Sequence, residues 1–212
     1  MKPKGSIRIH SGQSSHRATL PGISRELPLV EVKPGIFIAS DADLILGDVE
    51  FLSKSSELLA TKVRPLKVDV VVTAEAKSIA LAYELSKRLS LERFVVARKS
   101  QKAYMGDYFS QKVRSITTES EQQLLITREE LDYLCGKRVC LLDDVVSTGA
   151  TFTALGAIVK RAGGKIVCKA AIWREGPWCK QQGLIHLGTL PIFQDRPKNG
   201  ESTEKTSASS KV

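Results

Sequence analysis

The chain has 212 residues, of which 42% are hydrophobic and 26% are charged, a composition that fits one globular domain and excludes a disordered chain. No apolar run approaches the roughly 18 residues that span a bilayer, and residues 1–5 lead into polar sequence without a signal-peptide core, so we expect a cytoplasmic protein with no membrane partner. The net charge of +9 fits either a polyanionic partner or lysines spread over a solvated surface.

The two ends of the chain differ in composition from its middle. Residues 1–23 contain basic residues but no acid, which indicates a basic N-terminal arm that is mobile or loosely docked. Residues 194–212 are rich in Ser, Thr, Lys and Glu without apolar periodicity, which is typical of a disordered tail. We therefore expect one folded domain at residues 24–193, in which residues 24–66 form a separate small segment before the main sheet.

Within that domain, segments typical of strands alternate with segments typical of helices. Runs of β-branched and apolar residues predict strands at residues 68–73, 94–98, 138–142, 166–173 and 184–190. Apolar residues at helical spacing predict helices at residues 78–89 and 151–162. This alternation is typical of an α/β fold with a doubly wound, mainly parallel sheet, which binds ligands at the carboxyl ends of its strands.

Residues 111–127 interrupt the alternation. Two extended segments, around residues 113–116 and 124–126, are joined by the polar residues 117–121. This pattern predicts a flexible hairpin that projects from the sheet. We expect the hairpin to act as a lid over a binding site.

The most informative stretch connects the third predicted strand to the helix that follows it. Asp143 and Asp144 come directly after apolar residues, where an unpaired carboxylate is costly, and a turn of small and hydroxylated residues follows them. Backbone N–H groups at such a turn suit a phosphate, and the two acids suit the vicinal hydroxyls of a ribose or a hydrated Mg²⁺. Helix capping by Ser147 or Thr148 is the alternative, but capping does not explain the two acids.

This stretch resembles the signature with which type I phosphoribosyltransferases bind 5-phosphoribosyl-1-pyrophosphate (PRPP). The resemblance implies that Asp143 and Asp144 are catalytic, bind the ribose hydroxyls and hold Mg²⁺. It also implies that the turn wraps the 5-phosphate of PRPP, through Val146, Ser147, Thr148, Gly149, Ala150 and Thr151.

Two segments nearer the N-terminus extend the resemblance. The loop around Ala76, Lys77 and Ser78 is similar to the pyrophosphate loop of purine phosphoribosyltransferases, which often contains a cis peptide bond between non-proline residues. The basic residues that follow the second strand resemble a sequence that binds pyrophosphate in the same enzymes, and they are Arg98, Lys99 and Lys102. A solvated basic loop is the alternative interpretation of this second segment.

The resemblance covers about residues 33–190 and is closest to adenine phosphoribosyltransferases. Residues 33–37 resemble the start of their base-binding hood, which implies that Phe37 stacks on the base and that Val145 contacts it, although Phe37 could equally pack in the hood core. Ser147 differs from the aspartate usual in hypoxanthine–guanine enzymes. The sequence after Phe37 and the lid depart from the adenine pattern, and Glu119 would replace the catalytic acid of the adenine lid.

The resemblance thus predicts a Mg²⁺-dependent homodimeric enzyme of purine salvage. Its reaction would convert PRPP and a purine base, with adenine favoured, into a nucleoside monophosphate and pyrophosphate. One alternative is a regulator that senses PRPP and acts on a nucleic acid, but no helix-turn-helix pattern precedes residue 68, so we expect no nucleic-acid partner. Enzymes for hypoxanthine, guanine, xanthine or a pyrimidine remain further alternatives.

Overall fold

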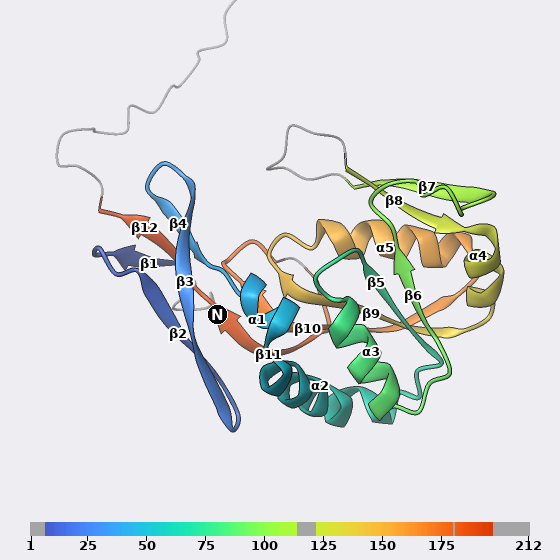
Figure 1. Cartoon of the computed structure of the whole chain (residues 1–212), viewed down its shortest axis with the longest axis horizontal. Helices are drawn as coiled ribbons and strands as arrows, with labels where there is room; N and C mark the ends of the chain where they lie inside the picture. Colours follow the sequence, from blue (N-terminus) through green and yellow to red (C-terminus); the bar gives the residue numbers. More distant parts are fainter. Residues whose placement is uncertain (1–6, 114–121, 180, 197–212) are drawn as a thin grey trace, which may run out of the picture.

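The computed structural model describes residues 7–113, 122–179 and 181–196, and its central element is a parallel five-stranded sheet (Figure 1). Every neighbouring pair of strands in this sheet is parallel, which confirms the predicted α/β class. In spatial order the strands are β11 (Leu184–Leu190), β10 (Lys165–Glu175), β9 (Arg138–Val146), β5 (Val70–Ala74) and β6 (Phe94–Ala97).

Helices cover both faces of this sheet. On one face, α2 (Val49–Val63) packs on β10 and β11, and α3 (Ile79–Arg88) packs on β5 and β6, with the short 3₁₀ helix η1 (Arg64–Leu66) after α2. On the other face, α5 (Ala150–Arg161) packs on β5, β9 and β10, and α4 (Arg128–Leu134) contacts α5. The predicted helices at residues 78–89 and 151–162 correspond to α3 and α5.

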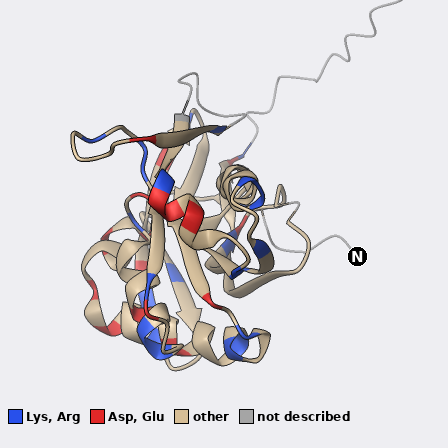
Figure 2. Cartoon of the chain, turned by 90° about the vertical axis from the view of Figure 1, so that its right-hand side faces the viewer, with Lys and Arg blue, Asp and Glu red and all other residues tan. Residues whose placement is uncertain are grey.

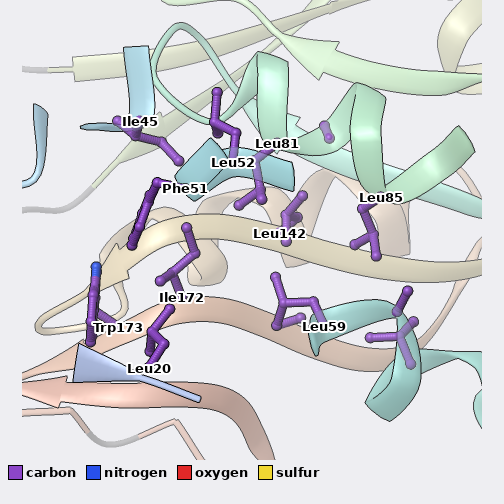
Figure 3. Close-up of a cluster of buried hydrophobic side chains, with 14 of the residues drawn as sticks. Leu20, Ile45, Phe51, Leu52, Leu59, Leu81, Leu85, Leu142, Ile172 and Trp173 are labelled. Atoms are coloured by element: carbon purple, nitrogen blue, oxygen red, sulfur yellow. The ribbon is translucent and has the colours of Figure 1, made fainter. Parts of the chain in front are cut away.

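The core between α2, α3 and the sheet fixes the strands whose carboxyl ends build the candidate site. Figure 3 shows Leu142 and Ile172 of the sheet facing the leucines of α2 and α3. Phe51 of α2 stacks on Trp173 of β10, with 6.3 Å between the ring centroids. Because burial of one such side chain stabilises the fold by about 1.5–3 kcal/mol, this layer holds β9 and β10 in a fixed register.

A second sheet, which is mixed because it contains both parallel and antiparallel pairs, forms a hood beside the core, seen on the left of Figure 1. In spatial order its strands are β1 (Ile7–His10), β12 (Ile192–Asp195), β4 (Ile36–Ala39), β3 (Ile23–Lys33) and β2 (Ser15–Leu20). Residues 7–10 and 15–20 are therefore strands of the hood and not part of a loosely docked arm. Strand β12 includes the first two residues of the expected tail, residues 194 and 195, whereas residues 197–212 lie outside the described residues.

The segment at residues 24–66 is less separate from the core than we expected. It supplies β3 and β4 to the hood and then α1 (Ala42–Gly47), but its last helix, α2, packs directly on the core sheet. The hood and the core are thus joined through α1 and α2.

The expected hairpin is present as β7 (Tyr108–Val113) paired with β8 (Gln122–Thr127), and its first strand lies nearer the N-terminus than predicted. The turn at residues 114–121, with Glu119, lies outside the described residues. Strand β8 is anchored to the core, because the backbones of Leu125 and Arg98 exchange hydrogen bonds of 2.7 and 2.8 Å and because Leu124, Leu125 and Ile126 are buried. The described part of the hairpin therefore does not project freely.

Acidic and basic positions are interspersed on the side of the molecule drawn in Figure 2. This mixture fits the interpretation that much of the net charge lies on a solvated surface. In the ranges that the structure describes, no helix has the length and apolar character needed to cross a membrane.

Candidate functional site

The acidic doublet lies within β9, which runs through Asp143 and Asp144 to Val146 instead of ending at residue 142 as predicted. The strand is longer because β10 continues beside it, pairing Ala171 with Asp143 and Trp173 with Val145. β5 pairs with β9 only up to Leu142, so beyond that residue β10 alone continues the strand to Val146. The doublet is consequently held on a rigid strand at the carboxyl edge of the sheet.

The two carboxylates of the doublet share one hydroxyl partner. The Oγ atom of Ser78 lies 3.1 Å from Oδ1 of Asp143 and 3.1 Å from Oδ1 of Asp144, so it can donate to either acid. Oδ1 of Asp143 also accepts a hydrogen bond of 3.0 Å from the backbone N–H of Asp144. Burial and the neighbouring charge of Asp144 raise the pKa of Asp143 well above its ordinary value. This pair can therefore both accept and donate hydrogen bonds.

Lys77 connects the doublet to the hood. Its ammonium forms an ion pair with Asp144 and lies 3.6 Å from Oδ1 of Asp41, the residue before α1. Burial acts to raise the pKa of Asp144, but its hydrogen bond with Asp143 and the charge of Lys77 outweigh burial and hold that pKa below its ordinary value. Burial alone would lower the pKa of Lys77, but the charges of Asp144 and Asp41 raise it overall. Asp144 and Lys77 are thus both charged near neutral pH.

The loop that carries Lys77 is fixed to the end of β6. The Glu75–Ala76 peptide bond is cis, as the resemblance implied. The backbone N–H of Glu75 donates to the carbonyl of Ala97 at 2.9 Å, and the carboxylate of Glu75 accepts from the backbone N–H of Lys99 at 2.9 Å. These two bonds bring Lys99 to the same edge of the sheet as Lys77.

The side chain of Gln181 packs against the small-residue turn between β9 and α5. Gly149 has φ +84°, and a Cβ atom at this position would lie 2.4 Å from the side-chain amide of Gln181. That amide donates to the carbonyl of Gly149 at 3.1 Å, and its oxygen accepts from Nζ of Lys169 at 2.7 Å. Glycine is therefore required at residue 149 both by its backbone conformation and by the close packing of Gln181.

Two adjoining cavities lie over these groups. A cavity of about 220 Å³ is bounded by the loop of Lys77, by Lys99 and by the acidic doublet. A cavity of about 170 Å³ is bounded by the turn after β9. Asp143, Val145 and Thr151 border both cavities, and Val113 of β7 covers both. The structure thus brings together the two acids and eleven of the other expected site residues, namely Ala76, Lys77, Ser78, Lys99, Val145, Val146, Ser147, Thr148, Gly149, Ala150 and Thr151. Val113 borders the same cavities but was not expected there.

Three other residues of the expected site border neither of these cavities. Arg98 uses its backbone to pair with Leu125. Lys102 lies in the loop that follows β6, and Phe37 stacks on His10 in the hood with 3.9 Å between the ring centroids. The structure therefore gives Phe37 the hood-packing contact that was the alternative to base stacking, and Glu119 lies outside the described residues.

Asp41, Glu175 and Gln181 adjoin the site but were not predicted from the sequence. Glu175 ends β10, is 8% exposed and accepts a hydrogen bond from Ser147. Burial raises its pKa, and the hydrogen bond from Ser147 acts in the opposite direction. Glu175 follows the apolar residues of β10 only after Arg174, so the signal that identified the doublet is weaker there, and no local pattern marks the burial of Asp41 or the contact of Gln181.

The described residues provide no protein-only metal cage, because they contain no group of three or more His, Cys, Asp or Glu side chains placed to hold an ion. Asp143 and Asp144 remain as two adjacent carboxylates. Mg²⁺ is commonly held by one or two carboxylates together with substrate phosphates and water, so the doublet fits this mode of binding.

Comparison with known proteins adds to this geometry. Residues 45–179 match the family model described as "Phosphoribosyl transferase domain". The chain is 32% identical over 157 residues to a xanthine phosphoribosyltransferase of Chloroflexus aurantiacus, covering 70% of this chain and 72% of the relative. It is 30% identical over 143 residues to an adenine phosphoribosyltransferase of Thermosipho africanus, covering 68% of this chain and 79% of the relative.

Solved structures show the same fold at lower identity. An adenine phosphoribosyltransferase of Thermoanaerobacter pseudethanolicus superposes with a TM-score of 0.59 at 22% identity, covering 83% of this chain and 95% of that chain. The enzyme of Giardia lamblia complexed with 9-deazaadenine gives a TM-score of 0.63 at 18% identity, covering 77% of this chain and 93% of that chain. Family and fold therefore agree with the motif at the carboxyl edge of the sheet.

Proposed function

The chain belongs to the phosphoribosyl transferase domain family, and from this premise we propose that it transfers the 5-phosphoribosyl group of PRPP to a purine base. It is a phosphoribosyltransferase enzyme, and the relatives named above act on purines. The products would be a nucleoside monophosphate and pyrophosphate, as in purine salvage.

One observation carries the proposal: the acidic doublet, the ammonium of Lys77 and the turn after β9 surround two adjoining cavities. PRPP is a ribose with a phosphate at one end and a pyrophosphate at the other. The turn after β9 suits the 5-phosphate, because helix α5 begins there and its first N–H groups lack partners within the helix. Lys77 and Lys99 suit the pyrophosphate, and the doublet between the two anion sites suits the ribose hydroxyls.

The reaction needs a group that stabilises positive charge on the ribose and groups that receive negative charge on the departing pyrophosphate. Asp144, ionised and held rigidly on β9, would stabilise the cation-like ribose in the transition state. Lys77 and Lys99 would neutralise the pyrophosphate as its bond to the anomeric carbon breaks. The ring nitrogen of the purine then forms the new bond on the opposite face, and we assign no covalent nucleophile.

Asp143 and Asp144 would also hold Mg²⁺ together with the ribose hydroxyls or phosphates of PRPP. The ion would supply further positive charge to the leaving pyrophosphate. The hairpin β7–β8 would limit the access of water to the site, because Val113 and Leu124 already border the larger cavity. This exclusion would favour transfer to the base over hydrolysis of PRPP.

We favour adenine as the base, and xanthine is the second candidate because of the 32% identity to a xanthine enzyme. The support for adenine comes from the resemblance of residues 33–37 to the adenine hood and from Glu175, a buried carboxylate that is hydrogen-bonded to Ser147 of the turn after β9. A carboxylate accepts hydrogen bonds, so it suits the amino group of adenine. Xanthine is an acidic purine with a carbonyl oxygen in the place of that amino group, and a neighbouring carboxylate disfavours this oxygen.

The decisive experiment supplies the protein with Mg²⁺, PRPP and one base at a time, and follows pyrophosphate release. We expect release with adenine at the highest kcat/KM and little release when no base is present. The matched variants are Asp144→Asn, which should abolish most of the activity, and Asp43→Asn, an exposed acid of α1 that should leave it unchanged. Absence of pyrophosphate release with adenine, hypoxanthine, guanine and xanthine would refute the proposal.

We further infer from the family resemblance that the enzyme is a cytoplasmic homodimer. Sedimentation velocity of the purified protein tests the oligomeric state. A monomer at micromolar concentrations would contradict the inference without affecting the proposed chemistry.

A further inference from the structure

Asp41 is an acidic side chain buried where the hood meets the core. Its side chain is 2% exposed, and it makes no capping hydrogen bond to α1, although aspartate is a favoured capping residue. Its backbone carbonyl accepts the hydrogen bond of the first turn of α1, from the N–H of Ile45 at 3.0 Å. The carboxylate is therefore directed away from the helix that it could have capped.

The charged partner of this carboxylate is Lys77. Oδ1 of Asp41 lies 3.6 Å from Nζ of Lys77, and Oδ2 has no hydrogen-bond partner among the described residues. Lys77 at the same time forms its closer ion pair with Asp144 of the doublet. One ammonium is thus shared by two buried carboxylates, one from the hood and one from the sheet.

This arrangement is a poor way to stabilise the fold. A buried carboxylate loses its hydration, and a single long contact with a shared ammonium replaces it only in part. A hydrophobic or amide side chain at residue 41 would avoid that cost. The presence of an acid here therefore points to a role in the site.

We propose that Asp41 is a positioning residue for Lys77, which keeps the ammonium at the pyrophosphate position when PRPP engages Asp144. This inference rests on the proposed function. Without Asp41, Asp144 would be the one acid among the described residues that forms an ion pair with Lys77, and it would draw the ammonium onto itself. The ammonium of Lys77 and the carboxylate of Asp144 would then form a closed ion pair, and PRPP would have to separate this pair before it could bind.

The geometry fits this division of roles. A lysine ammonium has three N–H donors, so contacts with Asp41 and Asp144 leave one donor for a phosphate oxygen. The distance of 3.6 Å to Asp41 is within ion-pair range but longer than a strong hydrogen bond, so Asp41 orients the ammonium without holding it tightly. Because Lys77 is 45% exposed, its amino group can reach a ligand in the larger cavity, which it borders.

The test measures the Kd of Mg·PRPP by calorimetry for the unaltered protein and for Asp41→Asn, with Asp43→Asn as the matched control on the same helix. Asp41→Asn should weaken binding by about tenfold, the size of an ordinary coupling between contacting charged groups, and Asp43→Asn should not change it. In a second background, Lys77→Met, the further change Asp41→Asn should alter the Kd by less than about twofold, because Asp41 acts through Lys77. A merely structural residue would give the same loss in both backgrounds.

Binding by Asp41→Asn that is as tight as in the unaltered protein, or tighter, would overturn the inference, as would an equal loss in the Lys77→Met background. If Asp41→Asn does not fold, Asp41→Ser replaces it in both backgrounds with the same expected outcomes. Failure of the unaltered protein to bind Mg·PRPP would overturn the proposed function and this inference together. If the unaltered protein binds Mg·PRPP but the Asp41 variants bind it equally well, only this inference is overturned and the proposed function stands.

Discussion

Replacement of Asp41 by Asn should stabilise the protein at neutral pH. Burial, followed by the charge of Asp144, raises the pKa of Asp41 from 3.8 to about 6, so its ionised form is less favourable in the folded protein than in the unfolded chain. Each pKa step corresponds to about 1.36 kcal/mol, so ionisation of this residue lowers the free energy of unfolding by up to about 3 kcal/mol above pH 6. The variant has no charge at this position and avoids that loss.

Because the pKa of Asp41 is higher in the folded protein than in the unfolded chain, the stability difference between the two proteins depends on pH. Below about pH 4 the acid is protonated in both the folded and the unfolded states, so it contributes nothing. Between about pH 4 and 6 only the folded state retains the proton, and the stability of the unaltered protein should fall relative to Asp41→Asn as the pH rises. The other acids titrate in both proteins, so the difference between the two isolates Asp41.

The assay is urea unfolding of both proteins at several pH values from about 3.5 to about 7.5, a range that brackets the interval from about 4 to about 6. We expect the variant to be more stable by up to about 3 kcal/mol at the upper end, and the difference to shrink toward the lower end. A variant that is less stable at neutral pH, or a difference that grows as the pH falls, would refute the assignment of a charged, poorly compensated acid at this position.

Three further predictions concern the site itself. Asp144→Asn should lower kcat by about 100-fold or more with little change in melting temperature, and an unchanged kcat in the pyrophosphate assay would remove this carboxylate from catalysis. Gly149→Ala should raise the KM for PRPP by about tenfold, because φ of +84° and the side chain of Gln181 both oppose a Cβ atom, and an unchanged KM would show that the turn does not depend on this conformation. Glu175→Gln should reduce the ratio of kcat/KM for adenine over xanthine by about tenfold, and a constant ratio would separate this carboxylate from base selection.

The core of the fold could be predicted because its signals are local. The β-branched run before the loop of Lys77 gave a strand within two residues of β5, and the apolar residues at 184–190 coincide with β11. The doublet and the turn after it were informative for the same reason. Two acids, whose burial is costly when they are unpaired, and a run of small residues directly follow an apolar strand. The extension of β9 to Val146 could not be predicted, because it depends on the pairing partner that β10 provides.

The hood could not be predicted because its signals are distant in sequence. Residues 7–10 alternate apolar and polar side chains over too short a run to predict a strand alone, and they become β1 by pairing with β12, which is far away in sequence. Residues 15–20 read as a polar arm, yet Ala18 and Leu20 are buried and β2 pairs with β3. The contact of Asp41 with Lys77 has the same origin, because it joins two segments whose relation is set only when the hood docks on the core.

The position of β12 between β1 and β4 has a consequence for biosynthesis. The two N-terminal hood strands β1 and β4 are made early, but the strand that lies between them leaves the ribosome only after β11. The five core strands can therefore pair while the hood sheet beside them is still incomplete. Completion of the hood sheet must therefore be a late event, in which β1 and β12, the first and last strands of the described chain, pair with each other.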